Sequence, residues 1–191
     1  MSKTFFISDT HFWHKNVISF ERRPYETVEE MNEKMIENWN NTVSDDDVVY
    51  HLGDFGIGNI DSNIEILKRL NGKIKLVKGN HDHTKNIKKM TPYLDEYLNA
   101  GHYLKSHKYQ FYLSHFPMQI GNRPRIFNLH GHIHSHPSTE LAQFNVGVDS
   151  MLMRKVLGKD YGQPATIEEI VEVVDLINPT LEQLKSLGHN R

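Results

Sequence analysis

Length, composition and charge place this chain among globular proteins. It has 191 residues, of which 38% are hydrophobic and 24% charged, which excludes disordered and fibrous proteins and suits a single domain over residues 1–191. It contains no cysteine, so it has no disulfide and no thiolate metal site, and its net charge of −2 offers no surface for duplex nucleic acid. No apolar run approaches the roughly 18–20 residues that cross a bilayer, and the apolar segment before Asp9 is too short for a signal peptide. We therefore expect a cytoplasmic protein without membrane contact.

Strands and helices alternate in the first half of the chain. Thr27 and Glu30 form a capping-box pattern, and Met31, Met35 and Trp39 follow on one face of the helix that it opens. A strand, a crossover helix and a second strand in sequence predict parallel strands with a right-handed connection. The expected elements are a strand over residues 3–8, the helix from Thr27, a strand over 48–50, a helix over 62–70 and a strand over 74–77.

Shorter strands follow after residue 100. We expect a hairpin over residues 103–113 that turns at 107–108, and two more strands over 125–129 and 144–148. A second capping box, Thr166 to Glu169, opens a helix that we expect to end before Pro179. Thr180 would then cap a last short helix.

Polar residues gather where five of these strands end. Such ends are where α/β sheets place ligand sites, because the strand ends converge while the loops supply reach. The alternation of His132 and His134 directs both side chains to one face of an extended segment. The clusters are Asp9-Thr10-His11, Gly53-Asp54, Gly79-Asn80-His81-Asp82, Ser114-His115 and Gly131-His132-Ile133-His134.

The clusters supply oxygen and nitrogen ligands. Aspartate, asparagine and histidine without cysteine suit Mn, Fe, Zn or Ni better than a thiolate zinc site. A set of turn residues on a histidine-rich surface is the alternative, but independent turns would not reproduce the five clusters in this order. We expect a metal centre.

In their order and residue types, the clusters resemble the five blocks of the calcineurin-like metallophosphoesterase family, across residues 9–134. The stretches around Asp9, Asp54 and His132 look most similar to its small, uncapped prokaryotic and phage members. The resemblance implies an α/β fold, a four-layer α/β/β/α sandwich of two mixed sheets flanked by helices. It also implies hydrolysis of a phosphate ester.

Further, the resemblance implies two divalent metal ions per chain and a role for each site residue. One ion would be held by Asp9, His11 and His134, and the other by Asn80, His115 and His132. Asp54 would bridge the ions together with a hydroxide. His81 would donate a proton to the leaving group and Asp82 would orient its ring. Manganese is the expected ion in vitro, with Fe, Zn or Ni as alternatives.

Three residues near these blocks have two interpretations each. Asp82 is either the partner of His81 or the cap of a following helix. His14 either contacts the substrate phosphate or faces solvent. Arg23, next to Arg22, either grips phosphate through its guanidinium fork or forms an ordinary salt bridge.

The identity of the phosphate ester is not determined by the resemblance. The residues after Gly53-Asp54 lack the arginine that marks large serine/threonine phosphatases, and the chain length leaves no room for the cap of a repair nuclease. We expect a small nucleotide-like phosphodiester as substrate. The alternatives are a phosphomonoesterase, a small phosphoprotein phosphatase, and, in another class, a non-catalytic metal-binding interaction module.

Overall fold

Parallel strands form most of the first sheet. The computed structural model describes residues 2–188. In it, a five-stranded sheet has the order β4-β3-β2-β1-β9. Strands β1 to β4 are parallel and β9 is antiparallel to β1, so the predicted parallel strands on either side of the crossover helix are confirmed. The strands are β1 (Thr4–Ile7), β2 (Val48–His51), β3 (Lys73–Val77), β4 (Glu96–Leu98) and β9 (Ala165–Thr166).

The second sheet has four strands in chain order. The predicted hairpin is confirmed: β5 and β6 are antiparallel, and His107 in their turn has φ 53°. Strands β6, β7 and β8 are parallel to one another, so this sheet is mixed as well. The strands are β5 (His102–Ser106), β6 (Tyr109–Leu113), β7 (Ile126–His130) and β8 (Gln143–Asn145).

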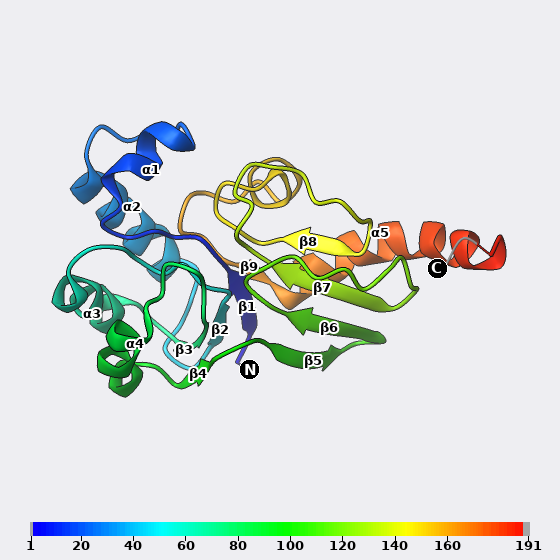
Figure 1. Cartoon of the computed structure of the whole chain (residues 1–191), viewed down its shortest axis with the longest axis horizontal. Helices are drawn as coiled ribbons and strands as arrows, with labels where there is room; N and C mark the ends of the chain where they lie inside the picture. Colours follow the sequence, from blue (N-terminus) through cyan, green and yellow to red (C-terminus); the bar gives the residue numbers. More distant parts are fainter. Residues whose placement is uncertain (1, 189–191) are drawn as a thin grey trace.

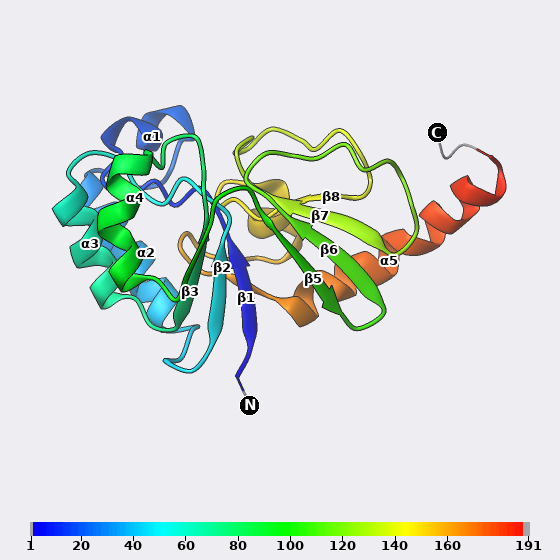
Figure 2. The same cartoon turned by 60° about the horizontal axis from the view of Figure 1, so that its bottom comes forward.

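Helices α2, α3 and α4 lie along one side of the first sheet, with α1 beyond its upper end (Figures 1 and 2). Their apolar faces and the outer residues of β1 to β3 form one buried cluster, in which Met31, Met35 and Trp39 are fully buried as their spacing predicts. These helices are α1 (Lys15–Phe20), α2 (Val28–Asn40), α3 (Ile60–Arg69) and α4 (Thr84–Met90), followed by the 3-10 turn η1 (Thr91–Tyr93).

Helix α5 (Ile167–Ser186) is longer than the sequence suggests. The predicted capping box between Thr166 and Glu169 is present, but the helix continues through Pro179 and includes the segment expected to be a separate short helix. A proline in a helix interior costs about 3 kcal/mol. Continuation is favoured because Leu181 is buried beyond it and the Asn178 amide donates to Glu182 (2.9 Å).

A second buried cluster joins the two sheets. Phe6 and Val77 from the first sheet, Phe111 and Phe127 from the second, and Ile170 of α5 belong to it. The π-helical turn η2 (Leu152–Val156) packs beside β8. The predicted α/β fold with two mixed sheets flanked by helices is therefore confirmed. No helix among residues 2–188 is long and apolar enough to cross a membrane.

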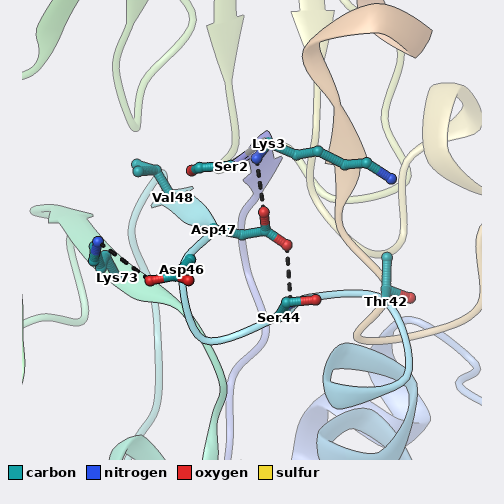
Figure 3. A pocket seen from close by; sticks show the side chains of 8 residues that line it. All are labelled: Ser2, Lys3, Thr42, Ser44, Asp46, Asp47, Val48 and Lys73. Atoms are coloured by element: carbon teal, nitrogen blue, oxygen red, sulfur yellow. Dashed lines mark hydrogen bonds and ion pairs between the residues drawn. The ribbon is translucent and has the colours of Figure 1, made fainter.

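The two ends of the parallel strands differ in chemistry. A cavity of about 560 Å³ lies at the start of β1, β2 and β3, lined by Lys3, Asp46, Asp47 and Lys73 among others (Figure 3). The Asp47 carboxylate accepts from the backbone N–H groups of Lys3 (2.7 Å) and Ser44 (2.9 Å), and Lys73 lies 3.9 Å from the exposed Asp46. The histidines and carboxylates predicted from the sequence lie at the opposite, carboxyl end.

Candidate metal centre

Five residues of the predicted site have a left-handed backbone. Few non-glycine residues adopt this conformation, although Asp, Asn and His do so more often than others, and each strained position costs about 1–3 kcal/mol. Such strain concentrates at functional sites. The residues are Asp9 (φ 56°), His11 (φ 51°), Asp54 (φ 55°), His132 (φ 71°) and His134 (φ 48°).

The first group of side chains comes from the loops after β1 and β7. Ligand atoms of Asp9, His11 and His134 all lie within 4.8 Å of one another. The rings of His11 and His134 stack with centroids 5.0 Å apart. His11 Nε2 is buried and has no hydrogen-bond partner, which is an unfavourable state for a polar atom unless a ligand satisfies it.

A second group forms around the Asn80 side chain. Asn80 Oδ1 lies 2.8 Å from His115 Nε2 and 2.8 Å from His132 Nδ1. The rings of His115 and His132 meet edge to face at 5.1 Å. Three residues from the loops after β3, β6 and β7 thus converge on one point.

Asp54 lies between the two groups. Its Oδ2 is 3.6 Å from His11 Nε2 in the first group and 3.5 Å from His115 Nε2 in the second. Ligand atoms of Asp9, Asp54 and His115 also lie within 4.8 Å of one another. The two groups are therefore contiguous, with the Asp54 carboxylate shared.

Hydrogen bonds on the far side of two rings determine which nitrogen faces the centre. His115 Nδ1 lies 2.8 Å from the Leu52 carbonyl oxygen and His134 Nδ1 lies 2.9 Å from Asp149 Oδ2, so each Nδ1 carries the proton. In the neutral ring, the Nε2 of His115 then presents a lone pair toward the oxygens of Asn80 and Asp54. Facing lone pairs repel unless a proton or a cation lies between them, and a metal ion can take the place of the proton, so these residues fit a metal ion.

Burial dominates the titration of Asp9 and His11 in the first group. It raises the pKa of Asp9 to about 6 and lowers the pKa of His11 to about 2. Burial penalises the charged form in both cases. His11 is consequently a neutral imidazole near neutral pH, which is the form that binds metal.

The structure corrects the prediction for Asp82. Its carboxylate does not contact the His81 ring and does not cap α4. Instead, Oδ2 accepts from the backbone N–H groups of Asp54 (2.8 Å) and Gly79 (2.8 Å), and Oδ1 accepts from Phe55 N–H (3.2 Å). Asp82 therefore fastens the loop that carries Asp54 to the loop that carries Asn80.

The structure also contradicts the substrate-binding role predicted for Arg23. It shows the alternative interpretation, a salt bridge. Its side chain is buried against Asp149, with Nε 2.9 Å from Oδ1 and Nη2 2.8 Å from Oδ2. The remaining donors reach the carbonyl oxygens of Thr10 and Asp9 (2.8 Å each) and the Met31 sulfur (3.5 Å). No guanidinium donor is left for a phosphate.

Asp149 is a site residue that sequence analysis missed. It accepts from His134 Nδ1 as well as from Arg23, and this position behind a histidine is typical of carboxylates that orient metal ligands. Asp149 directly follows the strand predicted over residues 144–148. Its proximity to His134 depends on the backbone hydrogen bonds between Ser8 and residues 146 and 148.

Two further histidines line the open side of the centre. His81 is exposed, and its ring centroid lies 5.4 Å from that of His11. His14 is half-buried, with Nδ1 3.4 Å from His11 Nδ1 and its ring 6.4 Å from that of His81.

Comparison with known proteins gives partial relatives and a solved structure of similar fold. An uncharacterized protein of Methanocaldococcus jannaschii is 49% identical over 84 residues, which are 43% of this chain and 48% of that protein. The Gene 66 protein of Mycobacterium phage L5 is 35% identical over 85 residues, 43% of this chain and 41% of that protein. The chain thus spans about half the length of the curated relatives that it matches.

A protein of unknown function from Aquifex aeolicus has the same fold, with a TM-score of 0.68 at 24% identity over 91% of this chain and 100% of that one. The sequence profile of the calcineurin-like phosphoesterases matches residues 2–175, nearly the whole described chain and all five clusters. The chain therefore belongs to the calcineurin-like phosphoesterase family.

Proposed function

We propose that this protein hydrolyses a phosphodiester with the help of two divalent cations. The proposed ligands are the seven residues predicted from the sequence: Asp9, His11, Asp54, Asn80, His115, His132 and His134. The observation that carries the proposal is the convergence of their lone pairs, including the buried and unpartnered Nε2 of His11. Membership of the phosphoesterase family supports the reaction class.

Bound cations would lower the pKa of water and offset negative charge on the phosphoryl oxygens. The protein's own groups hold and orient the reactants. The backbone N–H of His81 donates to Asp54 Oδ1 (2.8 Å), which anchors this residue at the centre while its side chain remains exposed. From there the imidazole is within reach of a leaving-group oxygen, where it would act as the proton donor. His14 would contact the phosphoryl oxygens from the same side.

The hydrogen bonds that already occupy Arg23 favour a diester substrate over a monoester. A phosphomonoester carries up to two negative charges near neutral pH and a diester carries one. The Arg23 guanidinium, the phosphate contact predicted from the sequence, is fully occupied by Asp149 and by backbone carbonyls. A singly charged, nucleotide-like diester therefore suits the centre better.

Hydrolysis of matched chromogenic esters tests the proposal. Protein loaded with Mn²⁺ is assayed with bis(p-nitrophenyl) phosphate and with p-nitrophenyl phosphate, and then with Fe²⁺, Zn²⁺ or Ni²⁺ in place of Mn²⁺. We expect the diester to have the higher kcat/KM, and a chelator to abolish turnover until metal is restored. Turnover of the monoester alone would indicate a phosphomonoesterase, and turnover of a phosphopeptide alone a protein phosphatase. Two bound ions without hydrolysis of any ester would indicate a non-catalytic metal-binding module.

A further inference from the structure

A pocket of about 560 Å³ opens beside the second metal group. Asn80 and His115, two of the proposed ligands, form part of its wall. A phosphate bound at the metal centre would therefore place one of its ester substituents at the mouth of this pocket. Pockets of 300–1,000 Å³ are typical of small-molecule sites.

One wall of the pocket is an aromatic and thioether surface. Phe116 is 51% exposed although it lies next to the metal groups, and its ring contacts those of His115 (5.1 Å) and His132 (4.5 Å) edge to face. Met118, 39% exposed, lies beside it in the same pocket. An apolar surface at the edge of a polar centre suits a planar group that stacks on the ring.

The loop that carries this wall is held rigidly by one buried asparagine. Asn128 on β7 donates to Ser114 Oγ (2.9 Å) and accepts from the backbone N–H of Met118 (2.8 Å). Ser114 Oγ in turn donates to the Phe116 carbonyl oxygen (2.7 Å). The exposed ring of Phe116 is thus presented by a fixed backbone, which lowers the entropy lost when a ligand binds.

Other lining residues are polar. They include Lys78 at the end of β3 and Asn99 between β4 and β5. Asn99 Oδ1 accepts from the Tyr97 hydroxyl (3.3 Å), which leaves the amide N–H groups to a ligand. Among residues 2–188, Lys78 forms no ion pair, and its ammonium donates to the Thr84 hydroxyl (3.3 Å).

We propose that this pocket binds the nucleoside part of the substrate, with the base stacked on Phe116. A nucleobase has both features that this lining requires, a planar apolar face for Phe116 and a hydrogen-bonding edge for Asn99. The inference rests on the proposed function, because the phosphate at the metal centre would hold the nucleoside at the pocket mouth. It adds a recognition site that the metal ligands do not provide.

A pair of esters with the same leaving group tests the pocket. The p-nitrophenyl ester of thymidine 5′-monophosphate is compared with methyl p-nitrophenyl phosphate, so that the two diesters differ only in the nucleoside. The readout is the ratio of their kcat/KM values in the wild type and in Phe116→Ala. Loss of base–aromatic stacking should reduce this ratio by about 5- to 150-fold. Phe116→Tyr, which keeps an aromatic ring, should retain most of it.

Phe20 supplies the matched control. It is 70% exposed and lies on the other flank of the centre, with its ring 6.3 Å from that of His14. Phe20→Ala should leave the ratio at the wild-type value. An unchanged ratio in Phe116→Ala, or a reduced ratio in Phe20→Ala alone, would overturn the inference while the proposed function stood.

Equilibrium binding separates failure of the pocket from failure of catalysis. The affinities of thymidine 5′-monophosphate and ribose 5-phosphate for the Mn²⁺-loaded protein are measured by calorimetry. We expect the nucleotide to bind more tightly, and Phe116→Ala to remove most of the difference. Absence of hydrolysis with a base-dependent affinity would refute the proposed function and keep the pocket. Equal affinities would refute the pocket.

Discussion

Arg23 and Asp149, 126 positions apart in the sequence, form a buried, two-pronged ion pair directly behind the proposed metal ligands. Asp149 Oδ2 also accepts from His134 Nδ1, and Arg23 also donates to the Asp9 carbonyl oxygen. One guanidinium therefore links the loop after β1 to the segment after β8, and through Asp149 to His134 in the loop after β7. The pair holds His134 and Asp9 in place relative to each other.

Removal of the Asp149 carboxylate should weaken both folding and metal binding. Asp149→Ala leaves the Arg23 charge buried and unpaired, which costs about 3–5 kcal/mol of unfolding free energy. Loss of a carboxylate behind a metal-binding histidine weakens metal affinity by about 10- to 100-fold. Denaturant unfolding of the chelated protein measures the first effect, and Mn²⁺ titration calorimetry the second.

An exposed ion pair provides the control for this variant. Arg69 pairs with Glu33 on the surface of α2 and α3, and an exposed pair contributes about 0–1 kcal/mol. Glu33→Ala should change neither Mn²⁺ affinity nor stability beyond that amount. If Asp149→Ala behaved like Glu33→Ala in both measurements, the positioning role of the ion pair would be refuted.

Metal binding should stabilise the fold measurably. An ion that binds only the folded state adds about 2.7 kcal/mol at a concentration of 100 Kd. For a domain of this size that corresponds to a rise in Tm of about 5–10 °C. Calorimetric melting of chelated and Mn²⁺-saturated protein measures the rise, and elemental analysis should find close to two ions per chain. An identical Tm in both states would contradict the metal centre.

Asp54→Ala should disable both metal groups together, because its Oδ2 lies beside His11 of the first group and His115 of the second. Asp9→Ala should mainly remove the ion of the first group. The number of bound Mn²⁺ ions, determined by elemental analysis after dialysis, distinguishes the two variants. Retention of two ions by Asp54→Ala would show that the carboxylate is not shared.

His81→Ala should keep both ions and lose much of kcat. A positioned general acid contributes about 10²- to 10⁴-fold in rate, and its loss matters less when the leaving group needs no proton. We therefore expect a large loss with alkyl esters and a small one with p-nitrophenyl esters. Equal losses across a series of leaving groups would leave His81 with a positioning role only.

Gly79→Ala should disturb the centre although it changes no proposed ligand. A Cβ at this position would overlap the Asp54 carboxylate, whose loop Asp82 fastens to Gly79. We expect Mn²⁺ affinity to fall by at least about tenfold, since a shift of the shared ligand affects both ions. Gly121→Ala, which has no atom within 4 Å of the added Cβ, should alter only local backbone strain. Normal Mn²⁺ binding by Gly79→Ala would argue against close packing of these two loops.

The sequence by itself determined which side chains meet at the centre. Asp9, Asp54, Asn80, His115 and His132 follow strands, and the carboxyl ends of parallel strands lie at one edge of a sheet. The periodicity of α2 likewise predicted its buried face, because helix geometry is local. Short strands such as β4 and β9 escaped detection, since two or three residues are too few to show an alternating pattern.

Only the tertiary structure decided the partners of the side chains behind these ligands. Arg23 pairs with Asp149 and Asp82 binds the backbone of Asp54, contacts that depend on how two loops from separate strands pack. Pro179 marks a helix end by local rules, but burial of Leu181 favours a continuous α5. Strand ends and helix faces follow from local geometry. A hydrogen-bond partner more than 100 residues away, and a proline inside a helix, depend instead on how the whole chain packs.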